Sequence, residues 1–198
     1  MDSTGTRTAV WWIRRDLRLA DNAALTRALS NAQTVLPVFI LDPALLNSEY
    51  VGPKRLEFLF ASLRELDSAL QSRGSRLITR RGHPLEILQK LVAESGVEAI
   101  FAERDYSAYA LKRDRRIAGT LPLNLVGTPS IRSPQVVMKR DGAPYTIFTP
   151  FSKAWMSVPL PRPSDLYPVP EHIPTPGGIP SEDVPFESDP NIACIPGW

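Results

Sequence analysis

The sequence of 198 residues has one cysteine, two histidines and no long run of apolar residues. The single Cys194 excludes an internal disulfide, and the chain has no cysteine and histidine cluster of the kind that binds zinc. No apolar run approaches the length of a membrane span, and the first residues lack the basic and apolar regions of a signal peptide. We therefore expect a cytoplasmic protein with no membrane partner.

Three common catalytic signatures are also missing. The sequence has no glycine-rich phosphate loop, no nucleophile elbow, and no pair of carboxylates arranged for hydrolysis. We therefore assign no catalytic residue to this chain.

The charge is divided unevenly along the chain. The net charge is only +2, but residues 1–158 hold 22 Lys and Arg against 15 Asp and Glu, whereas residues 159–198 hold one Arg against six acidic residues. The basic part permits transient contact with phosphates, although it does not establish nucleic-acid binding without a clustered basic face.

Short apolar runs alternate with longer amphipathic segments. We expect strands over residues 8–13, 35–41, 76–79, 99–102 and 123–126. The spacing and the capping residues predict helices over 23–30, from Pro53 to near Gly74, over 84–93 and over 107–117. Alternating strands and helices predict an α/β fold: a doubly wound, five-stranded parallel sheet, Rossmann-like, with helices on both faces.

The composition changes at Pro159. Eleven of the last 40 residues are proline, and no apolar period continues. We therefore expect a globular domain over residues 1–158 and a proline-rich acidic linker over 159–198. Such a linker suggests that the chain is a fragment of a longer protein.

The most informative segment is Trp12-Ile13-Arg14-Arg15-Asp16-Leu17-Arg18-Leu19-Ala20-Asp21-Asn22. An apolar strand ends there in a cluster of charges and a helix cap, and ligands of open parallel sheets bind just past the carboxyl ends of the strands. The same charges also suit a structural network in which Asp16 orders the loop.

Two later segments have clear local interpretations. Lys139-Arg140-Asp141-Gly142 predicts a basic hairpin turn, because the Asp-Gly pair tolerates the backbone of a tight turn. Thr149 and Pro150 predict a helix start, with Thr149 as the cap, and Phe151 and Trp155 lie four apart on one face of that helix.

The arginine segment resembles the N-terminal signature of the DNA photolyase and cryptochrome family. Residues 37–43, 54–63, 105–109 and 145–155 resemble further segments of that family in the same order, so the likeness covers roughly residues 8–157. It implies an N-terminal α/β domain that binds an antenna chromophore, most like that of a deoxyribodipyrimidine photolyase. The FAD cofactor, the partner helical domain that carries it, and most of the surface for UV-damaged DNA would lie outside this chain, which alone should not repair DNA.

The resemblance implies a pigment site near Arg15, Ile40, Leu41, Arg55 and Asp105. Each residue also has a structural interpretation: the two aliphatic residues suit the core, Arg55 suits an exposed helix surface, and Asp105 suits a cap of the helix that Ser107 begins. Asp42 suits a cap of the turn that follows it.

The resemblance favours a deazaflavin or a flavin such as FMN or FAD as the antenna. Family members that bind a folate antenna carry an Asn-Glu pair early in the helix where this chain has Tyr109 and Ala110, which disfavours methenyltetrahydrofolate. Three alternatives stay open: a cryptochrome that signals through partners, a nucleotide-binding α/β module, and a domain without pigment that only scaffolds its partner.

Overall fold

A computed structural model describes residues 6–128, 130–131 and 133–185. Cys194, on which the predictions about disulfides and compartment depend, lies outside the described residues. Among the described residues no helix is long and apolar enough to cross a membrane.

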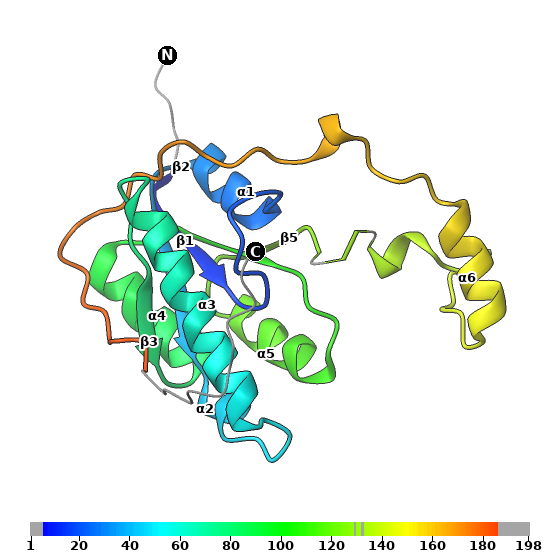
Figure 1. Cartoon of the computed structure of the whole chain (residues 1–198), viewed down its shortest axis with the longest axis horizontal. Helices are drawn as coiled ribbons and strands as arrows, with labels where there is room; N and C mark the ends of the chain where they lie inside the picture. Colours follow the sequence, from blue (N-terminus) through cyan, green and yellow to red (C-terminus); the bar gives the residue numbers. More distant parts are fainter. Residues whose placement is uncertain (1–5, 129, 132, 186–198) are drawn as a thin grey trace.

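The centre of the molecule is a parallel sheet of five strands in the order β3-β2-β1-β4-β5 (Figure 1). The strands are β1 (Thr6–Ile13), β2 (Ala32–Leu41), β3 (Ile78–Arg81), β4 (Ala99–Glu103) and β5 (Leu123–Val126). The chain builds outward from β1 in one direction and then returns to build outward in the other, so the topological switch point lies between β1 and β4. This confirms the predicted doubly wound fold and adds the strand order.

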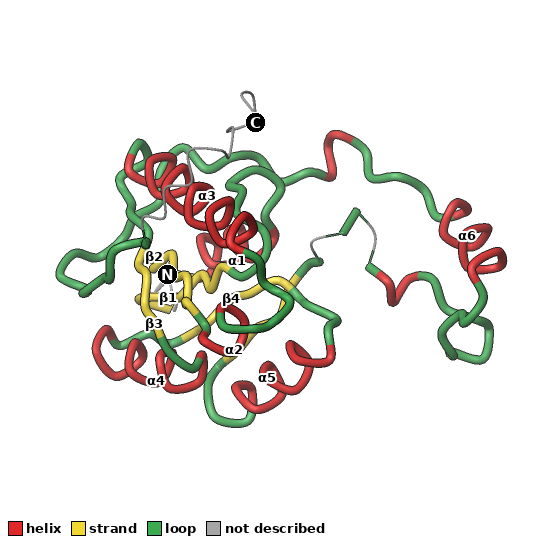
Figure 2. The backbone as a smooth tube through the Cα atoms, turned by 60° about the horizontal axis from the view of Figure 1, so that its bottom comes forward, coloured by secondary structure: helices red, strands yellow, loops and turns green. Residues whose placement is uncertain are grey.

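Helices cover both faces of the sheet (Figure 2). The helices are α1 (Ala23–Asn31), α2 (Pro43–Leu46), α3 (Pro53–Gln71), α4 (Pro84–Ser95), α5 (Ala108–Ala118) and α6 (Phe148–Ser157), with short 3₁₀ turns η1 (Pro134–Val136) and η2 (Pro163–Asp165). Buried side chains of α1 and α3 form one core on one face of the strands, and those of α4 and α5 form a second core on the other face. Burial of these apolar side chains on both faces explains why the strand sequences do not alternate.

Local signals in the sequence set most helix ends. The Asn22 side chain accepts a hydrogen bond from the backbone N–H of Leu25 at 2.9 Å and caps α1. Ser107 caps α5 in the same way, and Asp42 caps α2 through the N–H of Ala44 at 3.0 Å. Gly96 ends α4 in the left-handed conformation, with φ of 61°, which glycine adopts without strain.

The start of α6 corrects one prediction. The helix begins at Phe148 with Ile147 at the cap position, and no side chain caps it, so Thr149 lies inside the first turn. Pro150 is tolerated there because the first N–H groups of a helix have no partner within it. The ring contact between Phe151 and Trp155, at 5.6 Å, confirms that these two residues share a face.

Residues 167–185, here called the strap, return across the α/β domain. The carbonyl of Pro174 accepts from the N–H of Val35 at 2.7 Å, and Ile173 is fully buried among the side chains of the α1 and α3 core. Farther along, the N–H of Glu182 donates to the carbonyl of Thr79 at 2.8 Å. The strap therefore covers β3, which is an edge strand and would otherwise present unpaired backbone groups.

Residues 133–166, here called the arm, project from the domain (Figure 1). The arm contains η1, a hairpin turn, α6 and η2. The turn over 139–142 confirms the predicted hairpin, since Gly142 has φ of 79° and Met138 and Pro144 form an antiparallel bridge. No residue of α6 is buried.

Candidate functional site at the carboxyl edge of the sheet

A small crevice lies at the switch point, where β1 and β4 end. Its lining comes from the ends of these two strands and the loops after them: Trp11, Trp12, Ile13, Arg14, Arg15, Asp16, Asn22, Glu103, Arg104 and Asp105. The crevice has a volume of about 10 Å³, which is room for one water molecule. It does not hold an aromatic ring system, so a planar ligand would lie over it rather than inside it.

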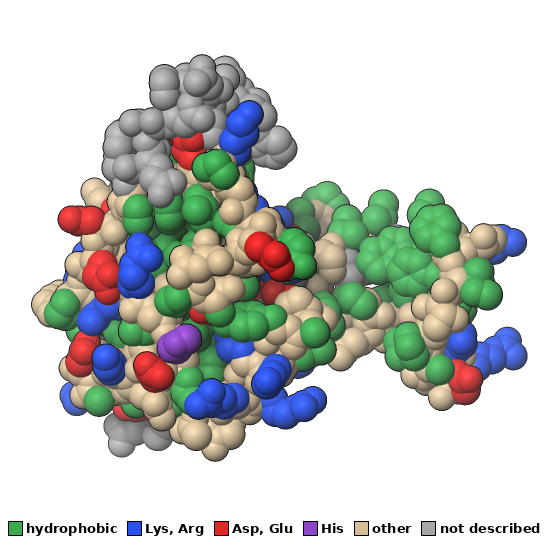
Figure 3. Space-filling model, turned by 90° about the horizontal axis from the view of Figure 1, so that it is seen from below, with side chains coloured by type: hydrophobic (Ala, Val, Ile, Leu, Met, Phe, Trp, Pro, Cys, Tyr) green, Lys and Arg blue, Asp and Glu red, His purple; other side chains and the backbone are tan. Residues whose placement is uncertain are grey.

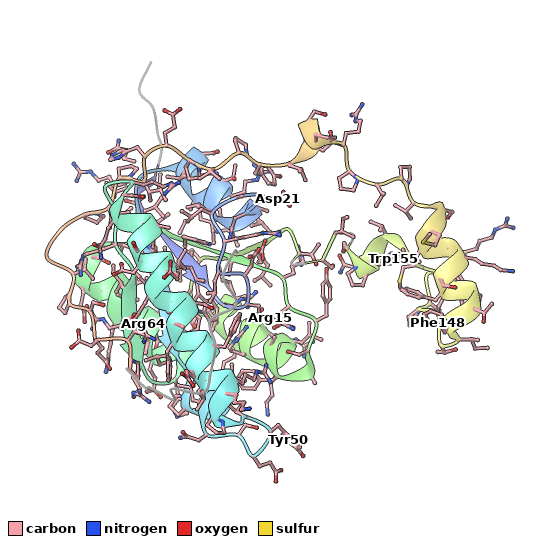
Figure 4. The ribbon with its side chains drawn as sticks, viewed as in Figure 1. Arg15, Asp21, Tyr50, Arg64, Phe148 and Trp155 are labelled. Carbon is pink, nitrogen blue, oxygen red and sulfur yellow. The ribbon has the colours of Figure 1, made fainter. Side chains whose placement is uncertain are left out.

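Arg15 and Asp105, two of the predicted site residues, meet at this crevice. A guanidinium nitrogen of Arg15 lies 3.5 Å from a carboxylate oxygen of Asp105, and the Arg15 side chain is 65% exposed against 12% for Asp105. Figure 4 shows Arg15 close to the end of β1 and to α5. An exposed guanidinium held by a shielded carboxylate is free to contact a ligand at the edge of the sheet.

Asp105 also has the structural role that the sequence suggested. Its Oδ1 accepts the backbone N–H of Ser107 at 2.9 Å. Burial alone would raise the pKa of Asp105, but the hydrogen bonds from Ser107 and the charges of Arg15 and Arg14 outweigh burial and lower it. Asp105 is therefore an anion at neutral pH.

Beneath the crevice lies a buried cluster of charges and an indole ring. Arg14 donates through Nη1 to both carboxylate oxygens of Asp114, at 2.8 and 2.6 Å, and Arg113 lies 2.9 Å from the same carboxylate. Both guanidiniums also contact the Trp12 ring, with their central carbons 5.0 and 4.8 Å from its centroid. Burial lowers the pKa of Arg14, and the charge of Asp114 opposes that effect. The cluster ties α5 to the end of β1.

A second group of carboxylates lies on the α1 side of the crevice. Asp16 accepts from the backbone N–H of Arg18 and lies 2.9 Å from its Nε, which confirms the predicted ion-pair network in this loop. Burial raises the pKa of Asp16. Burial and the charge of Asp16 raise the pKa of Glu103 to about 7, although Arg18 and Arg14 oppose this shift. Glu103 therefore exchanges a proton near neutral pH.

The structure places the other three predicted site residues apart from the crevice. Ile40 and Leu41 end β2, but they are 6% and 1% exposed and pack in opposite cores, on the two faces of the sheet. Arg55 lies exposed in the first turn of α3 and has no ion pair with a described residue. Contacts of these three residues with a pigment remain predictions.

Tyr109 fills part of the edge between α5 and α2. Its hydroxyl donates a short hydrogen bond to the carboxylate of Asp42, which is 4% exposed. Burial and this bond raise the pKa of Tyr109 to about 12. Tyr109 stands at the position where the resemblance places an Asn in folate-binding family members. In this chain its hydroxyl binds Asp42 instead.

The sequence pattern alone does not predict three residues of this site. Glu103 ends a strand, Asp114 lies on a basic helix, and Arg14 is one of several charges in the arginine loop. The one available signal was Asp114, a single acid among Lys112, Arg113, Arg115 and Arg116. The described residues contain no group of three or more side chains that could hold a metal ion.

The arm exposes many large apolar side chains. Phe148 and Met156 of α6 are 78% and 77% exposed, and Ile147 and Leu160 are 66% and 65% exposed. Figure 3 shows hydrophobic side chains gathered over the arm, and Figure 4 shows Phe148 on α6, far from Arg15. A groove of about 530 Å³ runs between the two ends of the arm and is lined by Ile131, Ser133, Val136, Val158, Pro159, Leu160, Pro161, Arg162 and Asp165. An exposed apolar surface of this kind marks an interaction site.

Comparison with known proteins decides the family. The family model for DNA photolyase matches residues 9–171. The chain belongs to the DNA photolyase family. A deoxyribodipyrimidine photo-lyase of a Synechococcus strain is 32% identical over 159 residues, which are 78% of this chain and 33% of that protein. A cryptochrome DASH of Gloeobacter violaceus is 33% identical over 200 residues, which are 92% of this chain and 39% of that protein.

A third relative is much shorter than these. An uncharacterised 31.6 kDa protein of another Synechococcus strain is 34% identical over 203 residues, which are 95% of this chain and 70% of that protein. The chain therefore spans about a third of that photo-lyase and two fifths of that cryptochrome DASH, but most of this short protein.

Two solved structures share the fold over nearly the whole chain. A class III photolyase from Agrobacterium tumefaciens has a TM-score of 0.77 and 27% identity over 92% of this chain and 38% of its own. An archaeal photolyase from Sulfolobus tokodaii, solved with two FAD molecules, has a TM-score of 0.71 and 26% identity over 89% of this chain and 40% of its own.

Proposed function

We propose that this chain is the antenna domain of a light-dependent DNA repair enzyme of the deoxyribodipyrimidine photolyase type. It holds a light-harvesting pigment at the carboxyl edge of its sheet and docks on a helical FAD-binding domain, which splits cyclobutane pyrimidine dimers by photoinduced electron transfer. The observation that carries this proposal is the exposed Arg15, held by Asp105 at the switch point of a chain that matches the photolyase family. Ligands of open α/β sheets bind at such a switch point.

The pigment we propose is a deazaflavin or a flavin, in preference to methenyltetrahydrofolate. The archaeal photolyase with two FAD molecules supports a flavin as a second chromophore in this family. The hydrogen bond between Tyr109 and Asp42 supports the same choice. Tyr109 stands where folate-binding family members carry an Asn, and its hydroxyl is already bound to Asp42. Arg15 and Asp105 would anchor the polar edge of the pigment, with Arg55 as a further cation.

The test is an absorption titration of the chain with FMN, FAD and a deazaflavin. Asp105→Ala and Arg55→Ala are the test variants, and Arg7→Ala is the control, because Arg7 is an exposed arginine at the opposite end of β1. We expect saturable binding of at least one pigment, weakened about tenfold or more by Asp105→Ala and unchanged by Arg7→Ala. Absence of binding to all three pigments contradicts the antenna function.

We further propose that the arm is the docking surface for the helical domain. The photolyase from Agrobacterium shares the fold over 92% of this chain, and 62% of that photolyase lies outside the matched part. No residue of α6 is buried within this chain. In a longer protein, the additional chain would cover this exposed apolar helix and stabilise the arm. Phe148 and Met156 would then be the central contacts.

Docking can be tested with the C-terminal two thirds of the Synechococcus photolyase as the partner, by analytical ultracentrifugation. We expect association with this chain, and at least tenfold weaker association for Phe148→Asp. Phe58→Asp is the matched control, because Phe58 lies on α3 and is 68% exposed. Equal weakening by both substitutions contradicts docking through the arm.

The cryptochrome relative supports a second candidate function, which is blue-light signalling. Both functions use the same antenna domain, so this chain alone does not separate them. A repair assay on DNA with cyclobutane dimers, using the complex with the helical domain, separates them: repair under light supports a photolyase, and its absence in a complex that binds pigment and FAD supports a cryptochrome.

A further inference from the structure

Two residues that line the switch-point crevice and are not exposed, Arg14 and Glu103, have polar atoms without a hydrogen bond or ion pair among the described residues. The Arg14 side chain is 7% exposed, and Asp114 occupies its Nη1, but its buried Nη2 has no hydrogen-bond acceptor. An unpaired buried donor is costly, so such groups are usually satisfied by water or a ligand. Arg14 lines the crevice, which is therefore a place for an acceptor.

Glu103 is the second group. It is the last residue of β4, it is half-buried, and it has no hydrogen bond or ion pair to any described residue. The other acceptor side chains of the crevice are committed: Asn22 caps α1, Asp16 pairs with Arg18, and Asp105 pairs with Arg15. Glu103 is therefore available to accept a hydrogen bond from a donor in the crevice.

The size of the crevice limits which ligand group can bind between Arg14 and Glu103. A volume of about 10 Å³ accommodates one group of the size of a water molecule. A phosphate group is larger than a water molecule, so the crevice does not enclose it. A hydroxyl fits both partners, because it accepts one hydrogen bond and donates one.

We propose that the crevice holds one hydroxyl of the polyol chain of the pigment, which accepts a hydrogen bond from Arg14 and donates one to Glu103. This inference rests on the proposed antenna function, because Arg15 and Asp105 line the same crevice and would hold the adjoining part of the pigment. It makes Glu103 a specificity residue, which selects a flavin or deazaflavin with a ribityl chain over a ring system without a polyol chain.

The test compares riboflavin with lumiflavin, which has the same ring system but a methyl group in place of the ribityl chain. Both are titrated by fluorescence against the native chain and against Glu103→Ala, Glu103→Gln and the control Arg7→Ala. We expect the native chain to bind riboflavin about tenfold more tightly than lumiflavin, since a hydrogen bond to a charged group contributes about this much.

Glu103→Ala should remove this difference and leave lumiflavin binding unchanged. Glu103→Gln should preserve most of it, because the amide oxygen still accepts, and it provides a second reading if the alanine variant does not fold. Equal affinity of the native chain for the two flavins, or equal weakening of both by Glu103→Ala, overturns the inference and leaves the antenna function standing. If neither flavin nor any deazaflavin binds, the antenna function fails and this inference fails with it.

Discussion

Removal of the Asp114 carboxylate is the sharpest stability test of the site. Asp114 is 4% exposed and neutralises two guanidiniums, those of Arg14 and Arg113, whose side chains are 7% and 10% exposed. Asp114→Ala would leave two buried cations facing each other without a counter-charge. Breaking a buried pair by removal of one partner costs about 3–5 kcal/mol, and we expect a loss in this range. A domain of this size has about 5–15 kcal/mol of stability, so the variant should remain measurable.

The measurement is urea unfolding at pH 7, followed by far-UV circular dichroism. Glu94→Ala is the matched control, because it breaks the ion pair with Arg80 at 2.7 Å, in which Glu94 is 39% exposed. Exposed pairs contribute about 0–1 kcal/mol, so this control should cost far less. Replacement of Arg14, Arg113 and Asp114 together by Met and Leu should recover much of the loss, since apolar residues of similar volume tolerate burial. A loss below about 1 kcal/mol for Asp114→Ala would refute the reasoning.

Three further changes have defined outcomes. Glu103 has a pKa of about 7 in the folded chain against an ordinary value of 4.5, so its ionisation destabilises the fold as pH rises from about 4.5 to 7. Glu103→Gln should therefore be more stable than the native chain at pH 8 but not at pH 4, as measured by urea unfolding at both pH values. Ile173→Ala should cost about 2–5 kcal/mol in the same assay, because Ile173 is the strap residue that is fully buried in the α1 and α3 core; a cost near zero would mean that the strap does not pack. Tyr109→Phe should cost about 1 kcal/mol through loss of the bond to Asp42, and an unchanged urea midpoint would contradict that bond.

The sequence predicted the elements best where burial on both faces decided them. The predicted strand 123–126 coincides with β5, and the predicted ends of β1 and β2 at Ile13 and Leu41 are confirmed. β2 begins three residues earlier than predicted, because Ala32 pairs with Thr6 and the hydroxyls of Thr8 and Thr34 meet at 3.0 Å. Pairing with a neighbouring strand, which no local pattern reports, stabilises those polar residues.

The edge strand β3 also differs from its prediction, because it begins and ends later in the sequence than expected. The apolar residues predicted a strand over 76–79, whereas the observed strand is Ile78–Arg81. Arg80 and Arg81 pair with Ile40 and Leu41 of β2, and the strap bonds to the other side of the strand. Partners distant in sequence therefore decide which residues of a short edge strand are in register.

The candidate site was predicted less well, because its key groups are defined by burial. The arginine loop was recognisable from an apolar strand that runs into charges, and Arg15 with Asp105 was correctly placed at one edge of the sheet. The isolation of Glu103 depends on which neighbours pair with each other instead of with it. The absence of a partner for Glu103 among the described residues follows from the tertiary structure, and the local sequence around a glutamate at a strand end does not predict it.

The crevice and the arm lie on different parts of the molecule, and this separation constrains the proposed function. The crevice is built from β1, β4 and the loops after them, whereas the arm begins beyond β5 and has no buried residue in its helix. Pigment binding and docking should therefore be lost independently, Glu103→Ala affecting only the first and Phe148→Asp only the second. A substitution in the arm that also weakened pigment binding by this chain alone would mean that the pigment site extends to the arm, and the two proposed roles would have to be revised together.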